Sequence, residues 1–325
     1  MTDGLHHVTE RPVLDGPVAS VEAETWALTR PDAHLALVRD GALVARASVW
    51  HRGPPRPDGA RTGCVGHAAW PTAADGRAVL AAALDALRTV GCAHALGPLD
   101  GSTWFSYRVV TEWGTAPPFW LEPPPQPVVA EAFAAAGFSP VAHYLSSRVD
   151  RLPDHSGMWA DDRRQLAARG ISVRPLDPAH AEAELGALYP LLLRAFADNP
   201  FYTPLERERF LALYGALVPH VDPALVLLAE REGAPVGVVL GLPNLAQPAR
   251  GEALDTLIVK TLAVDPTARG VGLGAALVRG VQEAARARGL SRAVHALMHA
   301  ENPSVRISDA LGTPFRRYAL LGRAL

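Results

Sequence analysis

The strongest constraint on the fold is that the 325-residue sequence repeats its own pattern about halfway along. Alternating apolar residues on either side of Asp40-Gly41 predict a β-hairpin over residues 34–50. The same arrangement returns around Glu232-Gly233, over residues 225–241. A single repeat of this length is typical of a duplicated domain rather than of a solenoid. We therefore expect two copies of one α/β fold in tandem.

The elements after each hairpin also correspond between the two halves. A strand that a proline halts comes next, at 64–70 in the first half and at 257–264 in the second. A helical pattern follows in each half and ends at a glycine, Gly91 or Gly289. We expect each copy to contain a mixed sheet of the α+β type. The predicted segments are a first copy at 1–152, a linker at 153–170 and a second copy at 171–325.

The composition excludes several classes of protein. The formal net charge of −2 gives no reason to expect binding to nucleic acid or to an anionic membrane. No stretch approaches the roughly 20 apolar residues that span a bilayer, and residues 1–13 lack the apolar segment of a signal peptide. Two cysteines, Cys64 and Cys92, are too few for a disulfide framework. We therefore expect a cytoplasmic protein.

One oddity of the composition is that Lys260 is the only lysine among 31 basic residues. A functional interpretation is that arginine was selected for bidentate recognition of anions. The alternative is an Arg-, Ala- and Pro-rich coding bias. We favour the bias, because it extends well beyond any one segment.

The segment most typical of a binding site is Arg269-Gly270-Val271-Gly272-Leu273-Gly274, which opens a predicted helix. Backbone N–H groups at a helix N-terminus bind a diphosphate well, because the helix dipole there also favours negative charge. Glycine has no Cβ, so the three glycines allow close approach of a ligand to the backbone. Arg269 adds a positive charge beside them. The loop therefore predicts a phosphate-binding site.

The order of elements in the second half, together with this loop, resembles the GNAT acetyltransferase family. The family's pyrophosphate loop reads Gln/Arg-x-x-Gly-x-Gly/Ala, and Arg269, Gly272 and Gly274 fill that pattern. The resemblance covers about residues 171–325, with the first half as a diverged copy. It implies acetyl-CoA as co-substrate, with the pantetheine arm pairing with the preceding strand. The implied cofactor-binding residues are Leu262, Ala263, Val264, Arg269, Gly270, Val271, Gly272, Leu273, Gly274, Ala275 and Asn302.

Other interpretations of the loop are open. Gly270, Gly272 and Ala275 also fit a dinucleotide-binding fingerprint, but no acidic residue occupies 292–298 and too little chain remains for that sheet. A phosphate loop of the nucleotide-hydrolase kind needs Gly-Lys-Ser/Thr, which is absent. A glycine-rich helix entry without a ligand is the third possibility. Motif and element order together favour acyl-CoA.

The corresponding loop of the first half, residues 71–77, has lost this chemistry. It keeps one glycine and carries Asp75, which would repel a diphosphate. We therefore expect one active site, in the second half, and a first copy without cofactor.

The catalytic residues are less well marked than the loop. Attack on a thioester requires a neutral amine, so a general base should lie near the strand before the loop. Glu252 and Asp255 are the candidates, and a solvated loop explains them as well. The resemblance implies a tyrosine acid in the helix after Asn302, but that helix has none, and Ser308 stands among the nearest replacements.

A metal site is not expected. His295 and His299 are four residues apart on a predicted strand, about 13 Å, which is too far for one ion. Either residue is explained as a structural histidine, and His299 also as a base or a substrate contact.

The sequence and the resemblance together predict an N-acetyltransferase. It would transfer an acetyl or another short acyl group from acyl-CoA to a primary amine by direct attack. The expected acceptor is a small molecule or a peptide, with no nucleic acid or membrane partner. We expect a monomer, in which the two halves form a pseudo-dimer, or a homodimer. The alternative is a non-catalytic protein that binds or senses acyl-CoA, which the missing tyrosine favours.

Overall fold

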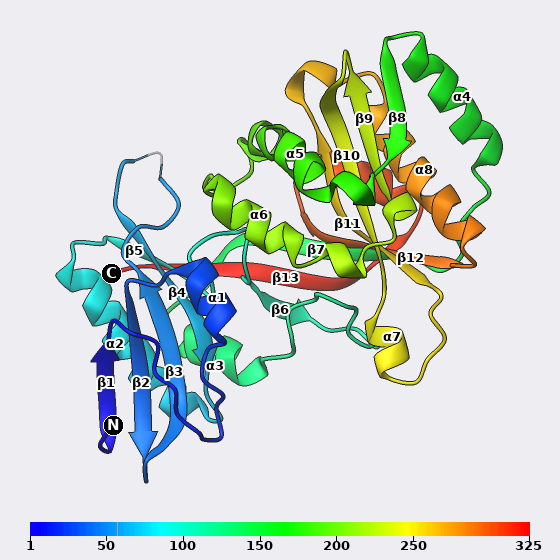
Figure 1. Ribbon diagram of the computed structural model, residues 1–325. Helices are drawn as coiled ribbons and strands as arrows, with labels where there is room; N and C mark the ends of the chain where they lie inside the picture. The colour runs from blue at the N-terminus through cyan, green and yellow to red at the C-terminus, as the bar shows by residue number, and fades with distance from the viewer. Residues whose placement is uncertain (57) are drawn as a thin grey trace.

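The computed structural model describes residues 1–56 and 58–325 as two α/β halves that share one continuous sheet (Figure 1). The elements of the first half are β1 (Gly4–Val8), α1 (Ala23–Thr29), β2 (Ala33–Arg39), β3 (Ala42–Trp50), β4 (Thr62–Ala69), α2 (Ala73–Thr89), β5 (His94–Gly97), β6 (Val109–Glu112), α3 (Pro127–Ala135) and β7 (Ser139–Val149). The helix α4 (Ser156–Ala167) lies in the predicted linker. The elements of the second half are β8 (Ile171–Pro175), α5 (Ala181–Phe196), α6 (Arg207–Gly215), β9 (Val226–Arg231), β10 (Ala234–Pro243), α7 (Ala246–Ala249), β11 (Thr256–Val264), α8 (Leu273–Ala287), β12 (Arg292–His299), α9 (Ser304–Asp309) and β13 (Thr313–Ala324). The predicted mixed α/β architecture is confirmed.

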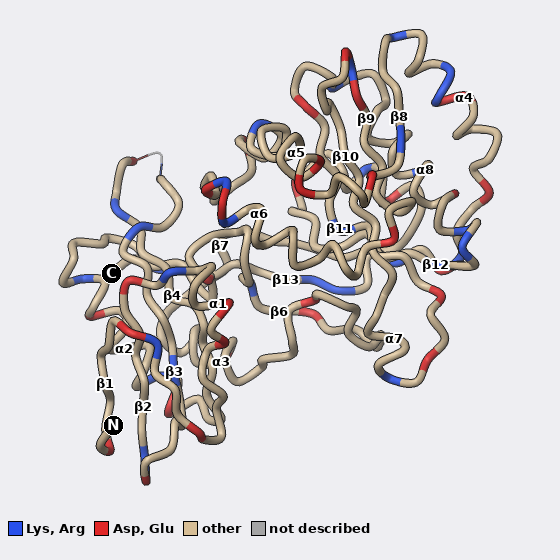
Figure 2. Tube along the Cα trace, viewed as in Figure 1, with Lys and Arg blue, Asp and Glu red and all other residues tan. Residues whose placement is uncertain are grey.

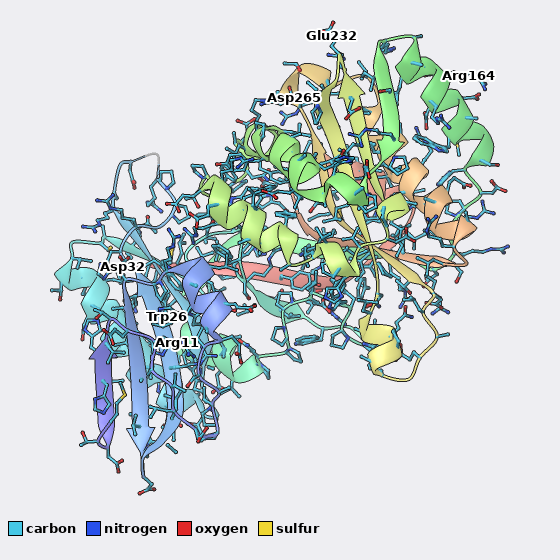
Figure 3. All side chains as sticks on the ribbon, in the orientation of Figure 1. Arg11, Trp26, Asp32, Arg164, Glu232 and Asp265 are labelled. Atoms are coloured by element: carbon cyan, nitrogen blue, oxygen red, sulfur yellow. The ribbon has the colours of Figure 1, made fainter. Side chains whose placement is uncertain are left out.

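The two predicted hairpins form with the same kind of turn. Asp40 and Gly41 between β2 and β3 both have positive φ, 50° and 73°. Glu232 and Gly233 between β9 and β10 repeat this, at 53° and 77°. Positive φ at both central residues defines a type I′ turn, whose twist matches that of the flanking strands. Glu232 marks the tip of the second hairpin in Figure 3.

The halves exchange their final strands. The sheet runs β1-β2-β3-β4-β5-β13-β7-β12-β11-β10-β9-β8, and β6 pairs with β13 off this path. Thus β13, from the second half, pairs with β5 of the first half, while β7, from the first half, pairs with β12 of the second. Figure 1 shows β13 crossing the middle of the molecule between the two halves. The boundaries at 152 and 171 stay a prediction, but neither segment completes its sheet with its own residues.

Separate helices cover the faces of this sheet. In the first half α2 packs against β2, β3 and β4, and α3 packs against α2 and β6, over a core that includes Phe133. In the second half α8 and α4 cover one face, and α5 and α6 cover the other. Residues 104, 105, 119 and 120 of the first half join the core beneath α5 and α6. The halves therefore share a core as well as a sheet.

The sequence of α8 explains why this segment forms a helix with one apolar face. Leu273, Leu277, Val281 and Ala285 recur every four residues and are all buried, which gives the helix one apolar face. The helix ends before Gly289, whose φ of 82° is left-handed as a C-terminal glycine requires. This helix fixes the direction of the glycine loop at its N-terminus.

Charged side chains of both signs are interspersed over the two halves (Figure 2). Within residues 1–56 and 58–325, no helix combines the length and the apolar character that crossing a membrane requires.

Candidate active site

The glycine loop opens α8 with two residues in a left-handed conformation. Gly270 has φ of 81°, and Gly272, the N-cap of α8, has φ of 79°. A Cβ built on either glycine would meet no heavy atom within 4 Å. The backbone conformation therefore requires glycine, while the space in front of the loop is open. The first N–H groups of α8 have no acceptor within the helix, so they are available to an anion.

An open groove of about 750 Å³ lies in front of this loop. Ten of the eleven residues predicted to bind the cofactor line it, and Val271 does not. The ten are Leu262, Ala263, Val264, Arg269, Gly270, Gly272, Leu273, Gly274, Ala275 and Asn302. The structure thus brings the predicted residues together in one groove, and their binding role stays a prediction.

The groove exists because β11 and β12 separate. Their parallel pairing runs from Thr256 and Arg292 to Val259 and His295 and stops there. Residues 262–264 still pair with β10, so their other edge faces the groove. Unpaired backbone amides and carbonyls along a strand are suited to pair with an extended ligand. This edge is where the pantetheine arm was expected.

Two ion pairs hold the end of α5 beside the loop. Arg194 pairs with Asp265 at 2.7 Å, between Nη2 and Oδ2, and Figure 3 labels Asp265. Arg269 lies 3.7 Å from Asp198, between Nη1 and Oδ2, and donates from Nη2 to the carbonyl of Ala195 at 3.3 Å. Arg269 is about half exposed. Its charge is therefore at the groove, and part of its hydrogen-bonding capacity is used to hold α5.

A second cavity continues the groove toward the centre of the molecule. It has a volume of about 250 Å³ and shares Leu262, His299 and Asn302 with the groove. Tyr107, Arg108 and Tyr144 come to it from the first half, and Lys260 and Tyr202 from the second. Both halves therefore contribute residues to the wall of this cavity. Tyr144 reaches it from β7, which pairs with β12 of the second half.

His299 stands where the groove and the cavity meet. Its Nδ1 accepts the N–H of Glu301 at 3.3 Å, and its ring packs edge-on against Tyr144 with centroids 5.2 Å apart. With Nδ1 accepting, the neutral ring carries its proton on Nε2. Burial lowers the pKa of His299 below its usual value, with Arg108 and His143 acting in the same direction and Glu301 opposing them. At neutral pH His299 is therefore a neutral hydrogen-bond donor.

The three residues predicted to be catalytic lie away from this junction. Glu252 pairs with Arg250 at 2.8 Å, and that hydrogen bond lowers the pKa of its carboxyl. Asp255 accepts from Gln247 and Thr256, both at 2.7 Å. It precedes β11, whose far end lines the groove, so seven residues of strand, about 23 Å, separate it from Leu262. The structure brings neither carboxylate to the groove.

Ser308 is fully buried beneath the cavity. Its Oγ lies 3.0 Å from Nδ1 of His295, whose Nε2 contacts Gln282 at 3.2 Å. Gln282 in turn contacts His155 at 3.0 Å. Burial lowers the pKa of His295 to about 4, so it is neutral at physiological pH. Of these four buried side chains, only that of His155 has a buried polar atom, Nδ1, without a hydrogen-bond partner among the described residues. The catalytic role of Ser308 stays a prediction.

Among residues 1–56 and 58–325, no group of three or more His, Cys, Asp or Glu side chains is arranged so that it could hold a metal ion.

The equivalent region of the first half is built differently. The side chain of Thr72 caps α2 by accepting the N–H of Asp75, and Asp75 pairs with Arg39 at 2.6 Å. A Cβ on Gly66 of β4 would lie 2.4 Å from Oδ1 of Asp100 and 2.5 Å from the carbonyl of Leu99. The chain itself therefore fills the space beside Gly66, whereas residues 67–69 at the end of β4 line a cavity of about 330 Å³. This arrangement supports the prediction that the first half binds no cofactor, which stays a prediction.

Residues 186–311 match the model of the acetyltransferase (GNAT) family. A bacterial ceramide synthase of Caulobacter vibrioides is 28% identical over 165 residues, 50% of this chain and 43% of that protein. A mycothiol acetyltransferase of Thermomonospora curvata is 31% identical over 151 residues, 46% of each chain. The chain therefore spans less than half the length of these curated relatives.

Solved structures extend the similarity to the first half. A tandem GNAT protein from the clavulanic acid biosynthesis pathway superposes with a TM-score of 0.53 at 15% identity, covering 99% of this chain and 98% of that one. At this identity the match shows the fold alone. The predicted fold of two GNAT-like copies in tandem is thereby confirmed.

Proposed function

We propose that the protein, whose residues 186–311 match the acetyltransferase (GNAT) family, transfers an acetyl or other short acyl group from acyl-CoA to a primary amine. The observation that carries this proposal is the continuous path from the glycine loop, along the free edge of β11, to the cavity between the halves. The path has a place for a phosphate at one end and for an acceptor at the other. Its middle lies beside residues 262–264.

Different residues along this path would bind different parts of the two substrates. The N–H groups at the start of α8, with Arg269, would hold the diphosphate of acyl-CoA. The free edge of β11 would hold the pantetheine amides. Acyl-CoA supplies an activated thioester when bound. The cavity around Lys260 and Tyr144 would hold the acceptor amine.

Transfer requires little more than this placement. The amine nitrogen forms a bond to the acyl carbon, the carbon–sulfur bond breaks, and the amine loses a proton while the thiolate gains one. No covalent bond to the protein is needed. The Nε2–H of His299, a residue that lines both the groove and the cavity, would donate a hydrogen bond to the developing negative charge. Holding the two reactants together supplies a large part of the rate enhancement.

Acetyl-CoA binding by calorimetry tests the cofactor half of the proposal. Gly274 is the best position to block, because it has a helical backbone and a Cβ there would meet only ordinary contacts of 3.6–3.7 Å. Gly274→Glu places a carboxylate and two methylene groups at the start of α8. We expect its Kd for acetyl-CoA to rise about 100-fold, about 2.7 kcal/mol.

Gly274→Ala is the matched control and should bind within a few-fold of the natural chain, since only a methyl group is added. Equal binding by the glutamate variant and the natural chain, or no binding by the natural chain, would refute the assignment of the loop. Release of free thiol in the presence of amines then separates an enzyme from a non-catalytic acyl-CoA-binding protein.

A further inference from the structure

The only lysine of the chain points into the cavity between the halves. Thr261 pairs with Leu240 and Val259 pairs with Gly241, so Lys260 between them has no partner on β10. A β-bulge of this kind turns a side chain away from the direction that regular alternation along the strand would give it. The side chain of Lys260 lines the cavity and an adjoining one. A coding bias explains why lysine is missing elsewhere, but it does not explain why lysine is kept at this position.

Arg108 approaches the same cavity from the first half. It is 8% exposed, and its φ of 75° is a left-handed conformation that is costly for a residue with a Cβ. Its guanidinium stacks on Tyr107 at 3.7 Å and on Tyr144 at 4.2 Å, measured to the ring centroids. Nη1 donates to the carbonyl of Leu297 at 3.1 Å, whereas the buried Nε has no acceptor. Arg108 therefore places a cation at the cavity wall, with a strained backbone and with its Nε lacking an acceptor among the described residues.

Neither cation has a counterion among residues 1–56 and 58–325. The described residues that line the cavity include no Asp or Glu, and neither Lys260 nor Arg108 forms a salt bridge with any of the described residues. Two carboxyl groups line the adjoining cavity, but both are engaged elsewhere. Glu122 pairs with Arg316, and Asp100 accepts the N–H of His67 at 2.6 Å.

This arrangement carries a free-energy cost in the unliganded protein. Burial lowers the pKa of Lys260 to about 8, and the charge of Arg108 acts in the same direction. Burying charge without a partner is unfavourable, so two such cations in one cavity are unlike a structural ion pair. Because backbone strain also occurs at Arg108, the cost is concentrated where a ligand would offset it.

We infer that Lys260 and Arg108 bind an anionic group, a carboxylate or a phosphate, that the acceptor amine carries. This inference rests on the proposed function, since it takes the cavity to be the acceptor end of the path. A guanidinium presents a planar fork to such an anion, and an ammonium adds a movable point charge. The acceptor is thus an amino acid, an amino phosphate or a related amphoteric amine.

The position of the two cations separates this site from the phosphates of acyl-CoA. Lys260 precedes Leu262 by two residues on β11, about 7 Å along the strand and away from the glycine loop. The glycine loop lies beyond the opposite end of β11, after Val264. The same positive charges disfavour an ammonium nearby, so they help the acceptor amine to attack in its neutral form.

The single lysine makes the test direct. Growth with lysine labelled at ¹³Cε gives one side-chain NMR signal, that of Lys260, in the intact chain. We would titrate it with β-alanine, with O-phosphoethanolamine and with ethanolamine, which differ in the anionic group that accompanies the amine. The expected result is a saturable shift with β-alanine or O-phosphoethanolamine and none with ethanolamine. Which of the two acts identifies the anion as carboxylate or phosphate.

Two variants test whether the NMR shift of Lys260 on anion binding depends on Arg108. Arg108→Gln should weaken binding of the active anion at least tenfold, because it removes the charge and keeps a donor near Leu297. Arg209→Gln is the matched control and should leave binding unchanged. Arg209 is a partly buried arginine that donates to the carbonyl of Leu28 and lies over the ring of Phe105. Equal loss in both variants would overturn the assignment to Arg108.

A kinetic measurement separates failure of this inference from failure of the proposed function. With acetyl-CoA bound, Lys260→Met should raise the KM for the anionic amine at least tenfold and leave the KM for acetyl-CoA unchanged. If acetyl-CoA binds and amines are acetylated, but no anion shifts the Lys260 signal, the inference is wrong and the proposed function stands. If the chain fails to bind acetyl-CoA, the proposed function fails, and the acceptor role inferred for the cavity fails with it.

Discussion

Replacing Arg316 with methionine is expected to lower the free energy of unfolding by about 3–5 kcal/mol. Arg316 lies on β13 with a fully buried side chain, and it forms a salt bridge with the equally buried Glu122. Its Nε donates to the carbonyl of Trp113 at 2.9 Å, and Nη2 donates to the carbonyl of Ala116. The variant would leave Glu122 without its counterion and two backbone carbonyls without donors, which is the costly way to break a buried pair.

Urea unfolding of the purified variants measures this effect. Arg317→Met is the control, because its neighbouring position on β13 places an exposed guanidinium against the exposed Glu112. Such surface pairs contribute at most about 1 kcal/mol. Adding Glu122→Leu to Arg316→Met should recover part of the loss, because it removes the unpaired carboxyl. Similar losses for Arg316→Met and Arg317→Met would contradict the importance of this pair.

The second large effect is expected for Asp100→Asn, which should change how the free energy of unfolding depends on pH. Burial raises the pKa of Asp100 to about 7, although the N–H of His67 and the charge of Arg46 oppose it. The side chain is 13% exposed. In the unfolded chain the pKa of an aspartate is about 3.9, so the folded state holds this proton more tightly.

The difference between the folded and unfolded pKa values of Asp100 sets the direction in which stability changes with pH. Below about pH 4 the proton is bound in both states, and the contribution of Asp100 to stability is fully present. As pH rises from about 4 to 7 the unfolded chain loses the proton first, so the natural protein loses up to about 4 kcal/mol. Asp100→Asn cannot ionise. Its stability relative to the natural chain should therefore rise steadily over this range and level off above about pH 7.

Urea unfolding at several pH values across this range tests the prediction. The control is Asp85→Asn, at an exposed position on α2 that pairs with Arg88. It should show the same pH dependence as the natural chain. If the curve for Asp100→Asn also runs parallel to that of the natural chain, the carboxyl is not held protonated by burial.

Local patterns in the sequence were sufficient to predict the mixed α/β fold and the position of the glycine loop at the start of α8. Both hairpins depend on dipeptides, Asp40-Gly41 and Glu232-Gly233, whose conformations are nearly independent of the rest of the chain. The glycine loop is similarly local, because Gly270 and Gly272 need left-handed backbone and lie next to the helix that they open. Residue type and spacing carry this information over a few positions.

The rest of the site depends on contacts between distant segments. Nothing in the alternation of β7 or β13 distinguishes pairing within a half from pairing across halves, so the entry of Tyr144 into the cavity was not predicted. Arg108 likewise reaches the cavity from the first half. Glu252 and Asp255 are close in sequence to β11, but they precede the strand, and its direction places them far from the groove at its other end.

The exchange of β7 and β13 also sets an order for synthesis. When the ribosome has completed the first half, the strand that belongs between β5 and β7 has not yet been made. The edges of β5 and β7 then stay uncovered while residues 150–312 are translated, and uncovered edges are where nascent chains aggregate. The first half can therefore complete its fold only after the second half has been made, and a chain that stops before β13 would leave both halves unfinished.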